Sequence, residues 1–142
     1  MRIADVLRSK GGEVVTIGPD ATVTELLDGL AGHNIGAMVV VGDGGVVGIV
    51  SERDVVRQLH KDGASVLSKP VDEIMTAVVS TCSKADTVDS LTLLMTENRV
   101  RHVPVLDDGN LIGIVSIGDV VKTRMEELES EHEQLQSYIT QG

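Results

Sequence analysis

Residues 48–56 read Gly-Ile-Val-Ser-Glu-Arg-Asp-Val-Val, and residues 113–121 read Gly-Ile-Val-Ser-Ile-Gly-Asp-Val-Val. The second copy follows the first by 65 residues, and the same offset aligns residues 14–56 with the second half of the chain without a gap. Repetition at a fixed offset indicates structural units that bury their faces against one another. We therefore expect two related units with pseudo-twofold symmetry and two similar clefts.

Each unit shows the same order of predicted elements. Threonines that favour helix N-caps precede the first helix of each unit, and Asp, Asn and Gly form turns between Val-rich and Ile-rich runs. The pattern predicts an α/β fold of the α+β kind, made of two β-α-β-β-α repeats. The expected elements of the two repeats are a first strand (13–17; 77–82), a helix after its N-cap (Thr22; Thr87), a hairpin (37–50; 102–115) and a closing helix (52–59; from 118).

The repeats suggest a domain division with short helical lead-ins at 3–7 and 71–75. A unit of about 60 residues is marginal alone because it buries too little of its unfolded surface. The two repeats should therefore share one core. The predicted division is residues 1–60 for repeat 1 with its lead-in, 61–70 for a linker, 71–125 for repeat 2 and 126–142 for a C-terminal helical extension.

The last helix continues well beyond the second repeat. Five apolar residues and His132 recur at spacings of four and three, which is the pattern of a helix seam. We expect this seam to lie on the module's own surface or on a twin subunit. A two-stranded coiled coil is disfavoured because many glutamates crowd the other faces. The seam residues are Val121, Met125, Leu128, His132, Leu135 and Ile139.

Composition excludes several classes of protein. A net charge of −10 and a pI of about 4.7 are unlike those of a general nucleic-acid binder, whose affinity rests on Lys and Arg. The longest apolar stretch, 35–50, is interrupted by 42–45 and is shorter than the roughly 20 apolar residues that span a bilayer. Met1–Asp5 lacks the apolar run of a signal peptide. We predict a cytoplasmic protein that binds neither nucleic acid nor membranes.

Cysteine and histidine usage gives no sign of a metal site. Cys82 is the single cysteine, which suits a reducing compartment, and we expect it to be a small buried hydrophobe. The histidines show no paired ligand spacing and have no cysteine partners. We predict no metal and no cofactor.

The repeated Gly-x-x-Ser-x-x-Asp lies where a strand passes into a helix. A helix start offers free N–H groups, glycine permits close approach of a ligand, and an ionised Asp can accept two hydrogen bonds from a ribose diol. The structural alternative is a capping box, in which Ser and Asp only satisfy the first turn of the helix. The two roles are compatible.

These segments, with Arg-His-Val-Pro-Val at 101–105, resemble a tandem pair of cystathionine-β-synthase (CBS) domains, or Bateman module, from Ile3 to about Arg124. The resemblance implies two CBS repeats packed with pseudo-twofold symmetry. It also implies a regulatory module that binds AMP, ADP or ATP, and in some members S-adenosylmethionine or NAD. Such modules often pair into a disc of four repeats, so a homodimer is expected.

The resemblance further implies that each cleft combines Ser-x-x-Asp of one repeat with strands of the other. The first cleft gathers Arg53 and Arg101, while the second has Gly118 and Gly36 at the matching positions. We therefore expect phosphorylated ligand in the first cleft, and a less charged adenosine compound or nothing in the second; the alternative for the arginines is solvated surface charge. The first cleft would comprise Ser51, Arg53, Asp54, Ser80, Thr81, Arg101, His102, Val103 and Pro104, and the second Ser116, Asp119, Thr16, Ile17, Gly36, Ala37 and Met38.

Three functions follow from these patterns. The first is a non-catalytic sensor that binds an adenosine-containing ligand between its CBS repeats and signals to an effector protein. The second is a scaffold or interaction protein with vestigial clefts, in which Ser-x-x-Asp serves only as a cap. The third, a small nucleotide-processing enzyme, is disfavoured because His102 is the one candidate general base near a cleft.

Overall fold

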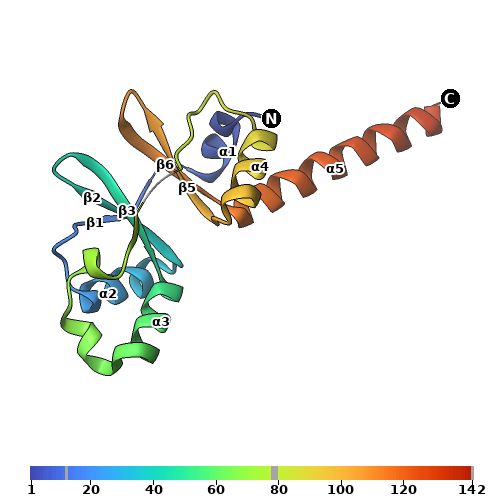
Figure 1. The fold of residues 1–142 in the computed structure, drawn as a ribbon. Helices are drawn as coiled ribbons and strands as arrows, with labels where there is room; N and C mark the ends of the chain where they lie inside the picture. Colours follow the sequence, from blue (N-terminus) through green and yellow to red (C-terminus); the bar gives the residue numbers. More distant parts are fainter. Residues whose placement is uncertain (12, 78–79, 142) are drawn as a thin grey trace.

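The computed structural model describes residues 1–11, 13–77 and 80–141 and confirms the α+β fold (Figure 1). Residues 78 and 79 of the predicted strand 77–82 lie outside the described residues. In chain order the elements are α1 (Ile3–Lys10), β1 (Thr16–Ile17), α2 (Val23–His33), β2 (Ala37–Gly42), β3 (Gly45–Ser51), α3 (Glu52–Asp62), the 3-10 helices η1 (Gly63–Ser68) and η2 (Val71–Glu73), β4 (Thr76–Ala77), α4 (Val88–Asn98), β5 (His102–Asp107), β6 (Asn110–Ser116) and α5 (Ile117–Gln141).

The predicted helix starts and hairpins are confirmed. Thr22 Oγ1 accepts a hydrogen bond from Glu25 N at 3.2 Å, and Thr87 Oγ1 accepts one from Ser90 N at 3.1 Å, as N-caps do. The second hairpin turns through Asp108 and Gly109, with φ of 50° and 81°. Asp and Gly tolerate this left-handed region better than other residues, which is why the turn forms there.

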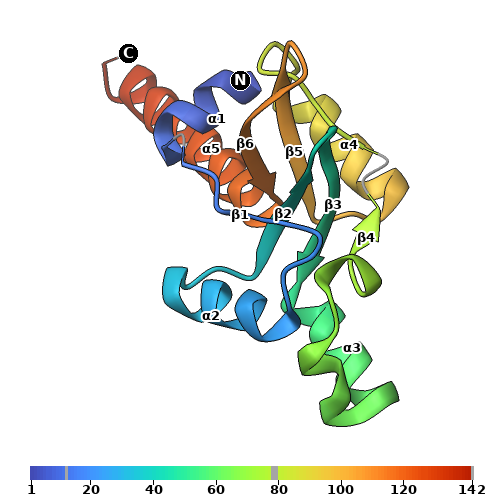
Figure 2. The same ribbon diagram turned by 90° about the vertical axis from the view of Figure 1, so that its left-hand side faces the viewer.

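The strands of the described residues form two sheets. In the first sheet β1 lies parallel to β2, β2 and β3 form an antiparallel hairpin, and β4 lies antiparallel to β3. In the second, β5 and β6 form an antiparallel hairpin, and Cys82 bridges to Val105. Figures 1 and 2 show the two hairpins side by side, with α2 and α3 at one end and α1 and α4 at the other.

The core is formed by two clusters of buried residues rather than by the single shared core that the sequence predicts. The second repeat's cluster includes Ile3 and Val6 of α1. The first repeat's cluster includes Val66, Val71 and Ile74 from the connection between the repeats. Each repeat therefore completes its core with a segment that precedes the other repeat, and this exchange joins the two.

This exchange modifies the expected division of the chain. The lead-in at α1 packs on the second repeat, although the sequence groups it with residues 1–60. The expected linker 61–70 is folded, and Val66 of η1 is fully buried. The proposed boundaries themselves stay a prediction.

Glycine permits β4 to lie against β3. A Cβ atom at Gly48 would lie 2.8 Å from the Thr76 carbonyl oxygen and 2.6 Å from Met75 Sδ. We expect Gly48→Ala to lower the free energy of unfolding by about 1–3 kcal/mol, because the backbone of β4 must move away. Thermal unfolding measures this loss. The control is Gly32→Ala in α2, where a Cβ meets nothing within 4 Å; equal unfolding temperatures for the two variants would contradict the packing account.

The C-terminal helix α5 leaves the module after its first turns. Val120 and Thr123 are buried, whereas Val121, Met125, Leu128, Leu135 and Ile139 are each more than half exposed. Figure 1 shows the helix projecting away from both repeats. Of the two positions predicted for this seam, the module's own surface is wrong, because these side chains are more than half exposed in the described structure, and a twin subunit stays a prediction. None of the described helices combines the length and apolarity needed to cross a membrane.

Candidate functional site

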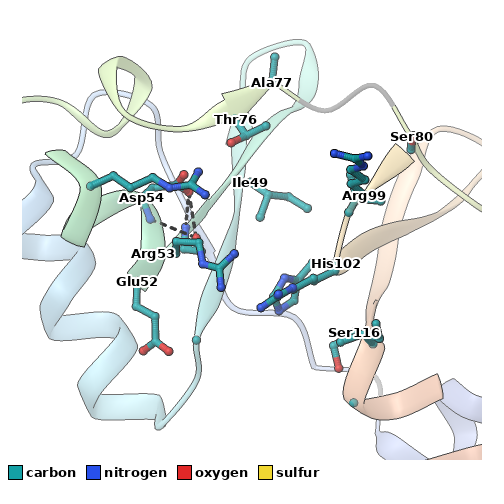
Figure 3. Close-up of a pocket in the computed structure, with 17 residues that line it drawn as sticks. Ile49, Glu52, Arg53, Asp54, Thr76, Ala77, Ser80, Arg99, His102 and Ser116 are labelled. Atoms are coloured by element: carbon teal, nitrogen blue, oxygen red, sulfur yellow. Dashed lines mark hydrogen bonds between the residues drawn. The ribbon is translucent and has the colours of Figure 1, made fainter. Parts of the chain in front are cut away.

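A cavity of about 590 Å³ lies between the two repeats (Figure 3). The start of α3 and the strands β3 and β4 line one side, and the segment that enters β5 and the start of α5 line the other. Ligand pockets commonly have volumes of roughly 300–1,000 Å³, so a nucleotide-sized molecule fits. The lining residues are Gly36, Ile49, Ser51, Glu52, Arg53, Asp54, Arg57, Thr76, Ala77, Ser80, Arg99, Val100, Arg101, His102, Ser116, Ile117 and Gly118.

Ser51 and Asp54 open α3 at one end of this cavity. Ser51 N and Ser51 Oγ donate to Asp54 Oδ2 at 2.8 and 3.0 Å, and Asp54 N donates to Ser51 Oγ at 3.3 Å. The predicted capping box is thus present. The hydrogen bonds given by the described residues all reach Oδ2, so Oδ1 can still accept bonds from a ligand.

Arginines concentrate the positive charge of this acidic chain at the cavity. Arg53 and Arg57 lie one helical turn apart on α3, and Arg99 and Arg101 come from the segment that enters β5. Arg99 has a left-handed φ of 54° where it ends α4. Arginine side chains bind phosphate oxygens with charge-assisted, often bidentate, hydrogen bonds. The cavity suits an anionic ligand, although Glu52 also lies at its edge.

Sequence reasoning missed Arg57 and Arg99. A signal for each was present, since Arg57 follows Arg53 by four residues and Arg99 precedes Arg101 by two. The helical spacing places Arg57 on the same face as Arg53. The positive φ at Arg99 depends on how α4 ends, and the sequence does not reveal it.

His102 lies at the centre of the cavity, where Figure 3 shows it and Arg53 pointing toward one another from the two repeats. Burial lowers the pKa of His102 below its ordinary value, and the Lys10 and Arg101 cations lower it further, against the opposing effect of Asp119. The imidazole is therefore neutral near pH 7. A neutral imidazole can donate one hydrogen bond and accept another, as recognition of a base edge requires.

The structure brings together most of the first predicted cleft. Ser51, Arg53, Asp54, Ser80, Arg101 and His102 all line the cavity. Thr81 is exposed and is not among the lining residues, while Val103 and Pro104 are buried in β5. The Pro104 carbonyl accepts a hydrogen bond from Cys82 N at 3.0 Å, so the start of the second repeat is tied to β5.

The second predicted cleft is less complete. Ser116 and Gly36 line the same cavity, whereas Thr16, Ile17, Ala37, Met38 and Asp119 are not among its lining residues. Met38 is buried in the first core cluster. Residues of both predicted clefts thus line one cavity in the described part of the chain. Ser51 and Asp54 of the first cleft both line it, whereas of Ser116 and Asp119 only Ser116 does.

Asp119 at the second end is held by a lysine. Lys10 Nζ donates to Asp119 Oδ2 at 2.7 Å and to the Ile114 carbonyl oxygen at 2.8 Å. Ser116 N and Oγ donate to the same Oδ2 at 2.9 and 3.0 Å. Burial raises the pKa of Asp119, but the bonds from Lys10 and Ser116 outweigh it and hold that pKa below its ordinary value.

Cys82 is buried, as predicted. Burial raises the pKa of its thiol to about 11, and Asp86 adds to this effect, so the thiol is protonated at neutral pH. The described residues contain no group of three or more His, Cys, Asp and Glu side chains placed to bind a metal ion.

Comparisons with known proteins agree with this architecture. The family model described as the CBS domain matches residues 3–61 and 71–126. The chain is 39% identical over 149 residues to the CBS domain-containing protein CBSX3, mitochondrial, of Arabidopsis thaliana, a match that covers 99% of this chain and 72% of that protein.

Solved structures of CBS-domain proteins share the fold. The CBS-domain containing protein ATU1752 from Agrobacterium tumefaciens is 46% identical, with a TM-score of 0.81 over 87% of this chain and 92% of that chain. The CBS domain pair of protein MJ0100, solved in complex with 5'-methylthioadenosine and S-adenosyl-L-methionine, is 26% identical, with a TM-score of 0.79 over 89% of this chain and 98% of that chain.

Proposed function

The chain belongs to the CBS domain family, and from this we propose that it is a regulatory sensor that binds AMP, ADP or ATP between its two repeats. The observation that carries the proposal is that four arginines and Asp54, whose Oδ1 can still accept hydrogen bonds, line one nucleotide-sized cavity. A related CBS domain pair is described in complex with two adenosine-containing compounds, which supports the adenosine part. S-adenosylmethionine and NAD are weaker candidates.

The cavity walls suit the three parts of a nucleotide. Asp54 Oδ1 can accept hydrogen bonds from ribose hydroxyls, and Arg53, Arg57, Arg99 and Arg101 offer donors to phosphate. Aliphatic side chains on the wall can clamp the adenine ring, since the described lining residues include no Phe, Tyr or Trp; they are Ile49, Ala77 and Val100.

We propose that the protein has no catalytic activity of its own. The Ser51 hydroxyl already donates to Asp54, and the Cys82 thiol is buried and protonated. Neither group is poised as a nucleophile. The output would pass to an effector protein. A cytoplasmic location stays our prediction, although the Arabidopsis relative is named as a mitochondrial protein.

One observation favours the alternative of a scaffold protein. Both Ser-x-x-Asp segments form complete hydrogen-bonded caps with nearly equal distances. Capping alone therefore explains their presence. The arginines are not explained by capping, and for this reason we favour the sensor.

Thermal unfolding with AMP, ADP, ATP, NAD and S-adenosylmethionine tests the proposed function. A ligand at 100 times its Kd stabilises the folded state by about 2.7 kcal/mol, and we expect the unfolding temperature to rise by several degrees with an adenine nucleotide. Inorganic phosphate at the same concentration is the control for unspecific anion effects. An unchanged unfolding temperature with every adenosine compound would favour the scaffold.

We also propose that α5 joins two copies into a homodimer. Its exposed seam repeats every three and four residues, as in paired helices. Arg124, which pairs with Glu127 of its own helix at 2.9 Å, and Glu129 flank the seam at positions that would face one another between two parallel copies. This attraction opposes the repulsion between glutamates that disfavours a two-stranded coiled coil. Exposed apolar residues in a continuous stripe are typical of a surface that binds a partner.

Deleting residues 126–142 should convert the dimer to a monomer. The truncated chain keeps Val120 and Thr123, so the core of the second repeat is retained while most of the seam is lost. Light scattering after size-exclusion chromatography measures the number of chains. Glu133→Gln, which lies off the seam, should leave that number unchanged; a truncated protein with the same number of chains would exclude α5 as the dimer contact.

A further inference from the structure

The two Ser-x-x-Asp segments form the same helix cap in different surroundings: Ser51 and Asp54 both line the cavity, whereas of the second pair only Ser116 does. Asp54 Oδ2 accepts hydrogen bonds from Ser51 alone. Asp119 Oδ2 accepts hydrogen bonds from Ser116 and, in addition, one from Lys10 Nζ at 2.7 Å. The Asp119 side chain is 21% exposed and the Lys10 side chain 34% exposed. This ion pair is therefore partly shielded from water, and screening weakens it less than a surface pair.

The fold explains why only one end has this lysine. Leu7 lies against Gly113 as Met75 lies against Gly48, so the two lead-ins correspond. After Met75 the chain becomes the strand β4, which pairs with β3 at Ile49. After Leu7 the chain stays helical to Lys10, and the lysine side chain, not a strand, reaches the Ile114 carbonyl oxygen. In the sequence, Val78 stands at the position that corresponds to Lys10.

The Lys10 ammonium group and a bound ribose would compete for the same Asp119 carboxylate. A ribose diol donates two hydrogen bonds to an ionised carboxylate, and the carboxylate accepts them best when no cation neutralises it. At Asp119 three donors already converge on one oxygen, and the cation lies on the carboxylate. Oδ1 of Asp119 receives no hydrogen bond from the described residues, as at Asp54, so the difference between the two carboxylates is the Lys10 cation, with which a ribose would compete for the carboxylate charge.

We propose that Lys10 is an internal cation that closes the second cleft, so that each chain binds one nucleotide at Asp54 and none at Asp119. The proposal rests on the proposed function. It assigns Lys10, 109 residues away from Asp119 in the sequence, the role of setting the number of sites.

Calorimetric titration with AMP of the full chain and its Lys10→Met variant tests this proposal. We expect one AMP per chain for the wild type and two for Lys10→Met, with the second AMP bound more weakly because Gly118 and Gly36 stand where the first cleft has arginines. The variant Lys10→Met/Asp119→Asn should return to one. The control Lys69→Met removes an ion pair of similar exposure, with Asp62 at 3.3 Å, away from the cavity, and should bind one AMP.

The outcomes separate the proposal from the function on which it rests. If Lys10→Met binds only one AMP per chain, or binds AMP at the Asp54 site more weakly than the wild type, the proposed role of Lys10 is wrong and the sensor function is unaffected. Absence of AMP binding by all four proteins would overturn the AMP site and the proposal together. Circular dichroism checks folding, and Lys10→Gln, which keeps a donor for the Ile114 carbonyl, replaces a misfolded Lys10→Met. If neither variant folds, Lys10 is a structural residue and the proposal is wrong.

Discussion

Replacing Asp54 with asparagine should weaken AMP binding by roughly 10-fold to 100-fold. Hydrogen bonds to a charged group contribute about 1.5–3 kcal/mol each, and about 1.4 kcal/mol corresponds to a factor of ten in affinity. Asparagine has nearly the same shape as aspartate but carries no charge and replaces one acceptor oxygen with a donor. Calorimetric titration with AMP measures the change.

The repeat supplies the matched control, Asp119→Asn. Both carboxylates cap a helix with the same three hydrogen bonds from and to the preceding serine, so each variant should lose about 1 kcal/mol of cap stability, and Asp119→Asn loses more because it also removes the ion pair with Lys10. We expect AMP affinity to fall for Asp54→Asn and to stay unchanged for Asp119→Asn. Equal loss of affinity in both variants, or no loss in either, would contradict the assignment of the ribose to Asp54.

The double variant Arg53→Ala/Arg101→Ala should weaken AMP binding by roughly 100-fold or more, while the affinity for adenosine changes little. Each arginine can donate a charge-assisted hydrogen bond to phosphate, of about 1.5–3 kcal/mol. The two come from opposite repeats and both line the cavity, but they share the one phosphate of AMP, so we expect the double variant to lose more than either single variant and less than the sum of the two. Titrations with AMP and with adenosine measure the difference.

Arg8→Ala is the control for the arginine variants. Its side chain is 77% exposed and pairs with Asp5 on α1, and it is not among the cavity residues. Arg8→Ala should leave AMP affinity unchanged. In the wild type, higher salt should weaken AMP binding because it screens the arginine charges. Unchanged AMP affinity in Arg53→Ala and in Arg101→Ala would show that these arginines are solvated surface charges.

The order of elements in each repeat could be predicted because local signals determine it. Threonine caps, Asp-Gly turns and Val-rich strands act over a few residues, and each was found where the sequence placed it. The exchange of lead-ins could not be predicted in the same way. The apolar pairs Ile3 with Val6 and Val71 with Ile74 have the same spacing, so local pattern does not show which core receives them.

The candidate site was predictable where the repeat motif defines it and not where distant residues meet. Ser51, Asp54 and His102 follow from the motif and the resemblance, and they line one cavity. Lys10 reaches Asp119 across 109 residues, and no motif marks it. The seam of α5 was visible as a pattern, but an apolar stripe does not show what covers it.

NMR observation of backbone amides during titration with AMP tests most directly whether the nucleotide binds in the cavity between the two repeats. We predict that the largest shifts map to Ser51–Asp54 at the start of α3 and to Arg99–His102 at the entry to β5, the two sides of the cavity. The amides of α5 beyond residue 128 should not move. Shifts confined to α5, or absent at saturating AMP, would contradict the claim that this protein senses an adenine nucleotide between its repeats.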